Sequence, residues 1–128
     1  MSAKSDYLEN KVIDHFLGTS STTAPSAVYL ALFTSDPTDA GSGTEVSGNG
    51  YARQAITFAA SSSGSASSNS AEEFTASGGA FGTVTHFGIF DALTSGNLLY
   101  HGALTASKTI ADGDTLRFAS GNITITEA

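Results

Sequence analysis

The sequence predicts a mainly β fold, an antiparallel β-sandwich of seven to eight strands with one N-terminal α-helix. Short apolar or alternating runs recur along the chain, separated by clusters of Gly, Asn, Asp and Ser, which is the pattern of strands joined by tight turns. Only one segment, close to the N-terminus, has a helical period. The densest apolar patterning lies in Phe81–Leu104, where two runs flank a polar segment and predict a central β-hairpin.

The helix is expected over Ser5–Leu17. Its apolar residues recur every three to four positions and form one stripe, namely Leu8, Val12, Ile13, Phe16 and Leu17. Ser5 or Asp6 can cap the start, Asp6 with Glu9 fits a capping box, and Gly18 is a natural stop. The stripe predicts either a helix packed on its own domain or an arm that docks on a neighbouring subunit. We therefore divide the chain into an N-terminal arm, 1–18, and a single β-sandwich domain, 19–128.

The strands follow in the second part of the chain. They are expected at Ala27–Thr34, Tyr51–Ala59, Ala71–Ala76, Phe81–Phe90, Leu98–Leu104, Lys108–Ile110, Thr115–Ala119 and Ile123–Thr126. The first of these has almost no polar residue, so it should be buried on both faces. Strict alternation would place two sets of hairpin side chains on core faces: Phe81, Thr83, Thr85, Phe87 and Ile89, and Leu98, Tyr100, Gly102 and Leu104. Ala60–Ser70 is low in complexity and is expected to form a flexible or surface loop.

The composition excludes several functional classes. The absence of cysteine removes disulfides, thiolate chemistry and cysteine-type zinc sites, and fits folding in a reducing cytoplasm. The formal net charge is −7, and the five Lys and Arg residues are scattered, which argues against binding to nucleic acid or to an anionic membrane. Only 13% of the residues are charged, about half the usual fraction, which suits a surface that packs against neighbouring proteins.

The polar residues do not form a recognisable catalytic pattern. His86 and His101 lie on the two arms of the hairpin, but two imidazoles make an incomplete metal site, and a structural pair is expected. Glu72 and Glu73 are adjacent on a predicted strand, so their side chains point to opposite faces. A Gly-x-Ser-x-Gly elbow, a P-loop and a dinucleotide fingerprint are all absent. We expect no enzyme, no cofactor and no metal.

Three stretches carry a resemblance to a known family. They are SDYLENKVIDHFLG, VYLALFTSDPTDAGSGTEVSGNGYARQAITF and GTVTHFGIFDALTSGNLLYHGALTASKTIADGDTLRF, and YLALFTSDP followed by GTEVSG-x-GYARQ is the most specific part. They resemble a family of small structural proteins of tailed bacteriophages, often labelled tail fibre or virion structural proteins. The resemblance implies a virion component, made and assembled in the host bacterial cytoplasm, with no catalytic residues to carry over.

These observations predict a non-enzymatic virion structural protein that assembles as a symmetric oligomer on the particle exterior. Its expected role is capsid decoration (cement) or a tail or neck accessory; the alternative is a tail-fibre or tail-tip module that binds a receptor or glycan. Expected partners are copies of itself and other virion proteins, with a host surface receptor under the alternative. Ser35–Gly50 is a long loop with three acids, and loops of this length are usually functional or ordered by a partner. The expected contact residues on helix and loop are Leu8, Val12, Phe16, Asp36, Asp39 and Glu45.

Overall fold

The computed structural model describes residues 2–127, so Met1 and Ala128, the outermost residues of the two predicted parts, lie outside it. In chain order the elements are β1 (Ser2–Lys4), α1 (Asp6–Phe16), β2 (Val28–Phe33), β3 (Gln54–Ile56), β4 (Ser65–Ser67), β5 (Glu72–Thr75), β6 (Gly82–Phe90), β7 (Leu98–Ile110), β8 (Thr115–Phe118) and β9 (Thr124–Thr126). The mainly β class with one N-terminal helix is therefore confirmed. Within the described residues, no helix is long and apolar enough to cross a membrane.

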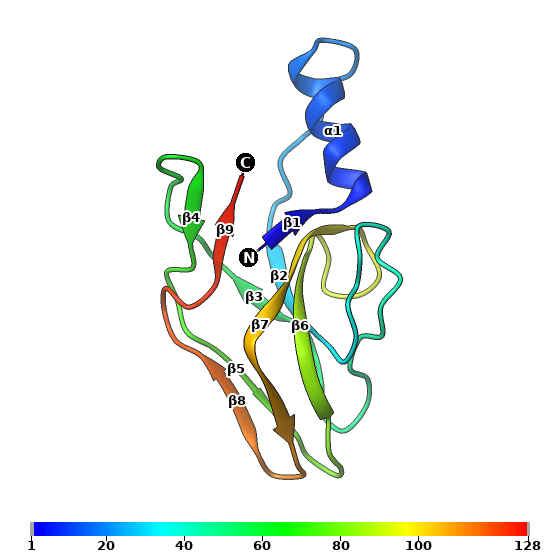
Figure 1. Cartoon of the computed structure of the whole chain (residues 1–128), viewed down its shortest axis with the longest axis vertical. Coiled ribbons are helices and arrows are strands. Elements are labelled where there is room, and N and C mark those ends of the chain that lie inside the picture. The colour runs from blue at the N-terminus through cyan, green and yellow to red at the C-terminus, as the bar shows by residue number, and fades with distance from the viewer. Residues whose placement is uncertain (1, 128) are drawn as a thin grey trace.

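The strands form one large sheet and two narrow ribbons. The large sheet has five antiparallel strands in the order β1-β7-β6-β2-β3, and the ribbons pair β4 with β9 and β5 with β8. Figure 1 shows the ribbons beside the large sheet, with α1 at one end of the molecule and the β5–β8 ribbon at the other. This is a sandwich-like arrangement, in which the ribbons serve as the second layer.

The main core lies between the large sheet and the ribbons. The sheet contributes Leu30, Leu32, Ile56, Val84, Phe87 and Ile89, and the ribbons and their flanking residues contribute Phe74, Leu116, Phe118, Ile123 and Ile125. A second cluster packs on the other face of the large sheet and consists of Ala31, Phe33, Phe90 and Leu98. Strand β2 supplies alternate residues to both clusters, which confirms the prediction that this strand is buried on both faces.

The predicted faces of the central hairpin are partly wrong, because two irregularities interrupt the β6–β7 ladder. Val84 pairs with Lys108 and His86 pairs with Ala103, so a single residue of β6, Thr85, stands opposite the four-residue segment 104–107. Such a bulge reverses which residues face the core. Val84 is fully buried there, whereas the threonines on either side of it are not.

The second irregularity affects the start of β7. Ile89 pairs with Tyr100, but the next residue, Phe90, pairs with Leu98. Leu98 therefore belongs to the second cluster, while Tyr100 packs against the main core. The prediction that these two β7 residues share a face was wrong for the same physical reason.

Several element boundaries also differ from expectation. The Ser-rich segment Ala60–Ser70, expected to form a flexible or surface loop, contains strand β4. The buried Ser68 hydroxyl within it accepts hydrogen bonds from the backbone N–H groups of Gly121 and Ile123. The two strands predicted within Leu98–Ile110 are one continuous strand, β7. Strand β1 was not predicted, since three residues are too few to show a period.

Candidate interaction surface

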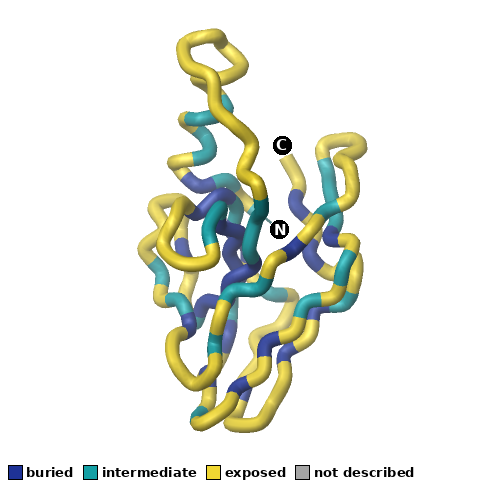
Figure 2. The backbone as a smooth tube through the Cα atoms, turned by 180° about the vertical axis from the view of Figure 1, so that it is seen from behind, coloured by how far each residue is buried: buried dark blue, intermediate teal, exposed yellow. Residues whose placement is uncertain are grey.

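Helix α1 has no buried residue. The exposed fractions of Ile13, Phe16 and Leu17 are 54%, 76% and 75%, whereas Leu8 and Val12 are half-buried. Figure 2 shows the largely exposed helix and the connection that follows it. The apolar stripe predicted from the sequence is thus partly buried near the start of α1 and exposed to solvent at its end. We call the exposed end, Ile13–Leu17, the helix tip.

Ser5, which is 2% exposed, fixes the start of α1. Its backbone N–H donates to the carbonyl of Leu99 at 2.8 Å, and its hydroxyl donates to the carbonyl of Leu98. The same hydroxyl accepts from the N–H of Leu8 at 3.2 Å, which makes Ser5 the N-cap in place of the Asp6–Glu9 capping box. The direction of the helix is therefore set by hydrogen bonds to β7.

The connection after the helix turns back along it. The N–H of Thr19 donates to the carbonyl of Asp14 at 3.0 Å, and the N–H of Thr22 donates to Nδ1 of His15 at 3.2 Å. A groove of about 220 Å³ lies between this connection and α1 and includes Leu8 in its lining. The connection thus shields one side of the helix and leaves the helix tip open.

The first half of the long loop approaches β7 at His101, a residue that is 8% exposed. Oδ1 of Asp39 lies 2.8 Å from Nε2 of His101, and Oδ1 of Asp36 lies 3.9 Å from its Nδ1. The carbonyl of Asp39 accepts a hydrogen bond from the N–H of Asp6 at 2.9 Å. The structure therefore brings two of the predicted contact residues, Asp36 and Asp39, to the base of the helix.

The two hairpin histidines are not directly opposite each other. His101 pairs with Gly88, and His86 lies two residues before Gly88 on the same strand. Nδ1 of His86 lies 2.8 Å from the hydroxyl of Thr85. No group of three or more side chains suited to hold a metal ion occurs among residues 2–127.

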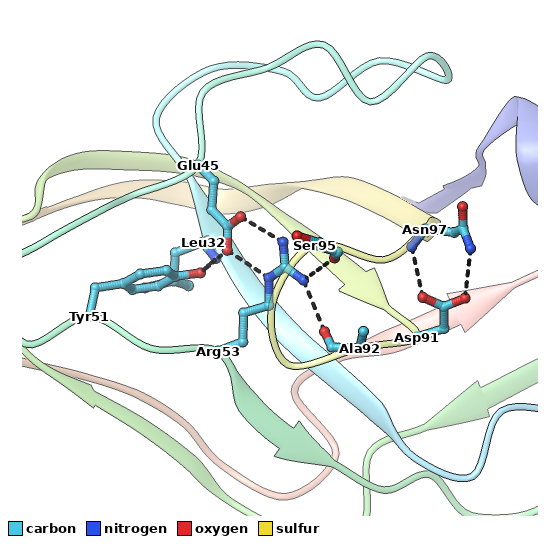
Figure 3. Close-up of polar contacts among 8 residues, drawn as sticks. All are labelled: Leu32, Glu45, Tyr51, Arg53, Asp91, Ala92, Ser95 and Asn97. Carbon is cyan, nitrogen blue, oxygen red and sulfur yellow. Dashed lines mark hydrogen bonds and ion pairs between the residues drawn. The ribbon is translucent and has the colours of Figure 1, made fainter.

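The second half of the loop ends in a polar cluster around Glu45 (Figure 3). Arg53 donates to both carboxylate oxygens of Glu45, from Nε at 2.9 Å and from Nη2 at 2.8 Å. The hydroxyl of Tyr51 donates to Oε2 of Glu45 at 2.6 Å and accepts from the N–H of Leu32 at 3.0 Å. Glu45 is therefore engaged within the chain through both of its oxygens.

The same arginine holds the turn between β6 and β7. Its Nη1 donates to the carbonyls of Ala92 at 2.9 Å and Ser95 at 2.7 Å (Figure 3). Its guanidinium lies 3.7 Å from the ring centroid of Phe90. Within this turn, Asn97 donates to both carboxylate oxygens of Asp91. The cluster thus ties the loop, β2 and the hairpin turn together.

Burial, followed by the hydrogen bond to Glu45, raises the pKa of Tyr51 well above its ordinary value. Burial alone would lower the pKa of Arg53, but the hydrogen bond and charge of Glu45 outweigh it and raise that pKa. The phenol therefore stays protonated and the guanidinium stays charged at neutral pH. Such a cluster is suited to holding backbone in place rather than to transferring protons.

Arg53 and Tyr51 were not among the residues predicted to matter. The sequence did contain one signal for them. Tyr51 and Arg53 are two residues apart on the predicted strand Tyr51–Ala59, so they share one face of it, and each side chain ends in a polar group. The partner of this pair could not be read from the sequence, since Glu45 lies in an irregular loop.

The matched family model covers residues 3–126 and is described as Podophage GP4 fiber I protein gp80. No curated protein matches the sequence at a significant level. The match runs from β1 to β9 and so includes the helix, the long loop and every strand of the described structure. The resemblance to structural proteins of tailed bacteriophages is thereby confirmed, and the chain belongs to the family of phage fibre proteins described as Podophage GP4 fiber I protein gp80.

Proposed function

We propose that this chain is a non-enzymatic structural subunit of a phage fibre, assembled in the host bacterial cytoplasm and held in the virion by contacts of its N-terminal arm and long loop. The partners are further copies of the chain and other virion proteins. The observation that carries the proposal is the helix tip, in which Phe16 and Leu17 are each about three-quarters exposed at the end of an anchored helix.

Exposed side chains of this size are unfavourable in water. Burying a Phe or Leu side chain stabilises an assembly by about 1.5–3 kcal/mol. Because Ser5 and Asp6 already fix the base of α1 to β7 and the loop, little backbone freedom is lost when the tip is covered. The geometry therefore favours a contact surface over a solvent-facing helix.

The arrangement of the polar side chains supports a structural role as well. The side chains of Glu45, Tyr51 and Arg53 form hydrogen bonds with one another and with nearby backbone groups. Asp39 is directed at His101 and at the start of the helix, so it links the loop to the arm. We infer that Asp36 and Asp39 orient the arm, and that Leu8 and Val12 support the tip from which Phe16 projects. Glu45 supports the loop from within.

The family match favours a fibre over capsid decoration or a neck accessory, the roles expected from the sequence. Copy number separates these roles. Quantitative mass spectrometry of purified virions should give a number of copies that fits a small set of fibres. A stoichiometry of hundreds of copies per particle would instead support decoration of the capsid lattice.

The direct test replaces side chains of the helix tip. The double variant Phe16→Ser/Leu17→Ser should fold normally by circular dichroism but enter particles at least tenfold less than the wild type. Deletion of residues 1–18 is a poorer test, because it also removes β1 and the Ser5 anchor from the large sheet. Leu93→Ser is the matched control, since Leu93 is 51% exposed but lies on the hairpin turn. Wild-type incorporation of the tip variant would overturn the proposal.

A further inference from the structure

A groove of about 640 Å³ separates β7 from β8. Its apolar lining includes Phe87, Leu104, Leu116 and Ile123, and its charged lining consists of Lys108 and Arg117. We call this the β7–β8 groove. It combines apolar and polar surface with positive charge on a chain whose formal net charge is −7.

The irregular course of β7 explains why the groove is open. The segment 104–107 has no partner in the β6 ladder, and the pairing of β1 with β7 reaches only Gly102. Strand β8 pairs with β5 alone among the ladders of residues 2–127. Both walls of the groove therefore present strand edges that no other strand of the described part of the chain covers, and such edges are common contact sites between chains.

Of the two positive charges of the groove, one has no ion-pair partner within residues 2–127 and the other has an exposed partner. Lys4 pairs with Glu127 and Arg53 pairs with Glu45, whereas Lys108 takes part in none of the ion pairs formed among residues 2–127. Arg117 lies 3.3 Å from Glu73, but both side chains are more than half exposed. Exposed pairs of this kind contribute at most about 1 kcal/mol. The groove therefore suits a partner that presents both apolar surface and negative charge.

The helix tip has this chemistry. Ile13, Phe16 and Leu17 supply the apolar surface, and the exposed Asp14 between them supplies the negative charge. The tip cannot reach the groove of its own chain, because α1 begins at β7 and extends away from the sheet for 11 residues, about 16 Å (Figure 1). The two surfaces are complementary but lie apart, so only a second copy can bring them together.

We propose that the helix tip of one copy docks into the β7–β8 groove of the next, with Asp14 facing Lys108 and Arg117. This inference rests on the proposed function and names the partner of the helix tip. The contact joins two different surfaces, so it is a head-to-tail contact. Repeated around an axis it closes into a ring of subunits, and without closure it continues as a filament.

The test mixes two variants that each lack one of the surfaces. The tip variant is Phe16→Ser/Leu17→Ser, and the groove variant is Lys108→Glu/Arg117→Gln. Light scattering coupled to size-exclusion chromatography should show oligomers for the wild type and monomers for each variant alone. A mixture of the two should form a 1:1 dimer and nothing larger, because one intact tip meets one intact groove. Oligomers of the groove variant alone, or a mixture that stays monomeric, would overturn the inference.

Charge reversal supplies a second measurement that does not depend on apolar truncation. Asp14→Lys should weaken assembly at least tenfold, and the combination of Asp14→Lys with Lys108→Glu should restore most of it. Asp112→Lys is the matched control, since Asp112 is also an exposed acid, and its Oδ1 accepts one hydrogen bond, from the N–H of Gly78 at 3.1 Å. Failure of the combined variant to recover would contradict the pairing of these two positions.

Incorporation into particles separates this inference from the proposed function. If the tip variant stays out of particles while the groove variant enters them normally, the helix tip is a virion contact but its site is not the β7–β8 groove. A different outcome is a wild type that is monomeric at all concentrations together with a tip variant that stays out of particles. In that case the helix tip binds another virion protein, and the inference that it docks into a second copy of the chain is wrong. If both variants enter particles as well as the wild type, both proposals fall.

Discussion

The carboxylate of Glu45 receives two parallel hydrogen bonds from the guanidinium of Arg53, at 2.9 Å from Nε and 2.8 Å from Nη2. The side chain of Arg53 is only 8% exposed, so solvent screens the pair weakly. Because Nη1 of the same residue holds the carbonyls of Ala92 and Ser95, one side chain connects the long loop to the turn of the central hairpin. Bidentate pairing of this kind also fixes the orientation of both partners.

Replacement of Arg53 should therefore destabilise the fold strongly. Arg53→Ala leaves the Glu45 carboxylate and two turn carbonyls without their donor, and leaving a partly buried charged group unsatisfied in this way costs about 3 kcal/mol. Arg53→Lys should still cost about 2 kcal/mol, because an ammonium group cannot reproduce the two parallel hydrogen bonds. Urea denaturation at neutral pH measures both free energies of unfolding.

Arg117→Ala is the control for this experiment. Arg117 also pairs with a glutamate, but in an exposed position, so its loss should change the free energy of unfolding by less than about 0.5 kcal/mol. Similar effects for the two arginine variants would contradict a structural role for the Glu45–Arg53 pair.

The raised pKa of Tyr51 predicts a loss of stability at alkaline pH. Burial and the hydrogen bond to Glu45 keep this phenol protonated in the folded chain, whereas in the unfolded chain it ionises near pH 10. Its contribution is therefore complete below about pH 10 and is lost as the pH rises from there towards the folded pKa. For one proton, stability falls by at most about 1.4 kcal/mol per pH unit.

Tyr51→Phe should remove this part of the slope between about pH 9.5 and pH 11, as measured by urea denaturation at several pH values. Tyr100 contributes a similar slope, because burial and then its hydrogen bond to Glu127 raise its pKa in the same direction. An unaltered slope in Tyr51→Phe would show that burial and the hydrogen bond to Glu45 do not keep the phenol protonated in the folded chain.

The sequence predicted those parts of the fold that depend on local patterns. The mainly β fold class, the helix and the buried strand β2 follow from the spacing of apolar residues, which can be read within one segment of the sequence. The faces of the central hairpin were partly mispredicted, because the bulge at 104–107 arises from how β7 pairs with β6, and that pairing cannot be read from either strand alone. Strand β4 was not predicted for a related reason, since its partner β9 lies much further along the chain.

The candidate contact surface was predicted to a similar extent. The apolar stripe of α1 was visible in the sequence, but which part of it stays exposed depends on the connection that turns back along the helix. The three acidic residues of the long loop, Asp36, Asp39 and Glu45, were all predicted as contact residues. Their partners, His101 for Asp39 and Arg53 for Glu45, lie far along the chain and were set by the tertiary fold.

Gly43 allows the first half of the long loop to close on itself. A Cβ atom at this position would lie 2.6 Å from the carbonyl oxygen of Asp36 and 2.7 Å from Cα of Pro37, which is fully buried. Gly43→Ala should therefore cost about 1–3 kcal/mol and move Asp36 and Asp39 away from His101. Urea denaturation measures the cost, and NMR chemical shifts of His101 report the displacement. Ala40→Ser, at an exposed site in the same loop, should change neither quantity.

Ser5 should control how firmly the N-terminal arm is held. Ser5→Ala removes the N-cap of α1 and leaves the carbonyl of Leu98 without its hydroxyl donor, so it should cost about 1–2 kcal/mol. Because the contacts of Ser5 lie at the base of the helix, the loss should concentrate in α1. Amide hydrogen exchange should accelerate there while β2 and β6 keep their protection. Ser20→Ala, at an exposed site beyond the helix, should leave exchange in α1 unchanged, and equal acceleration in both variants would show that the Ser5 hydroxyl does not anchor the arm.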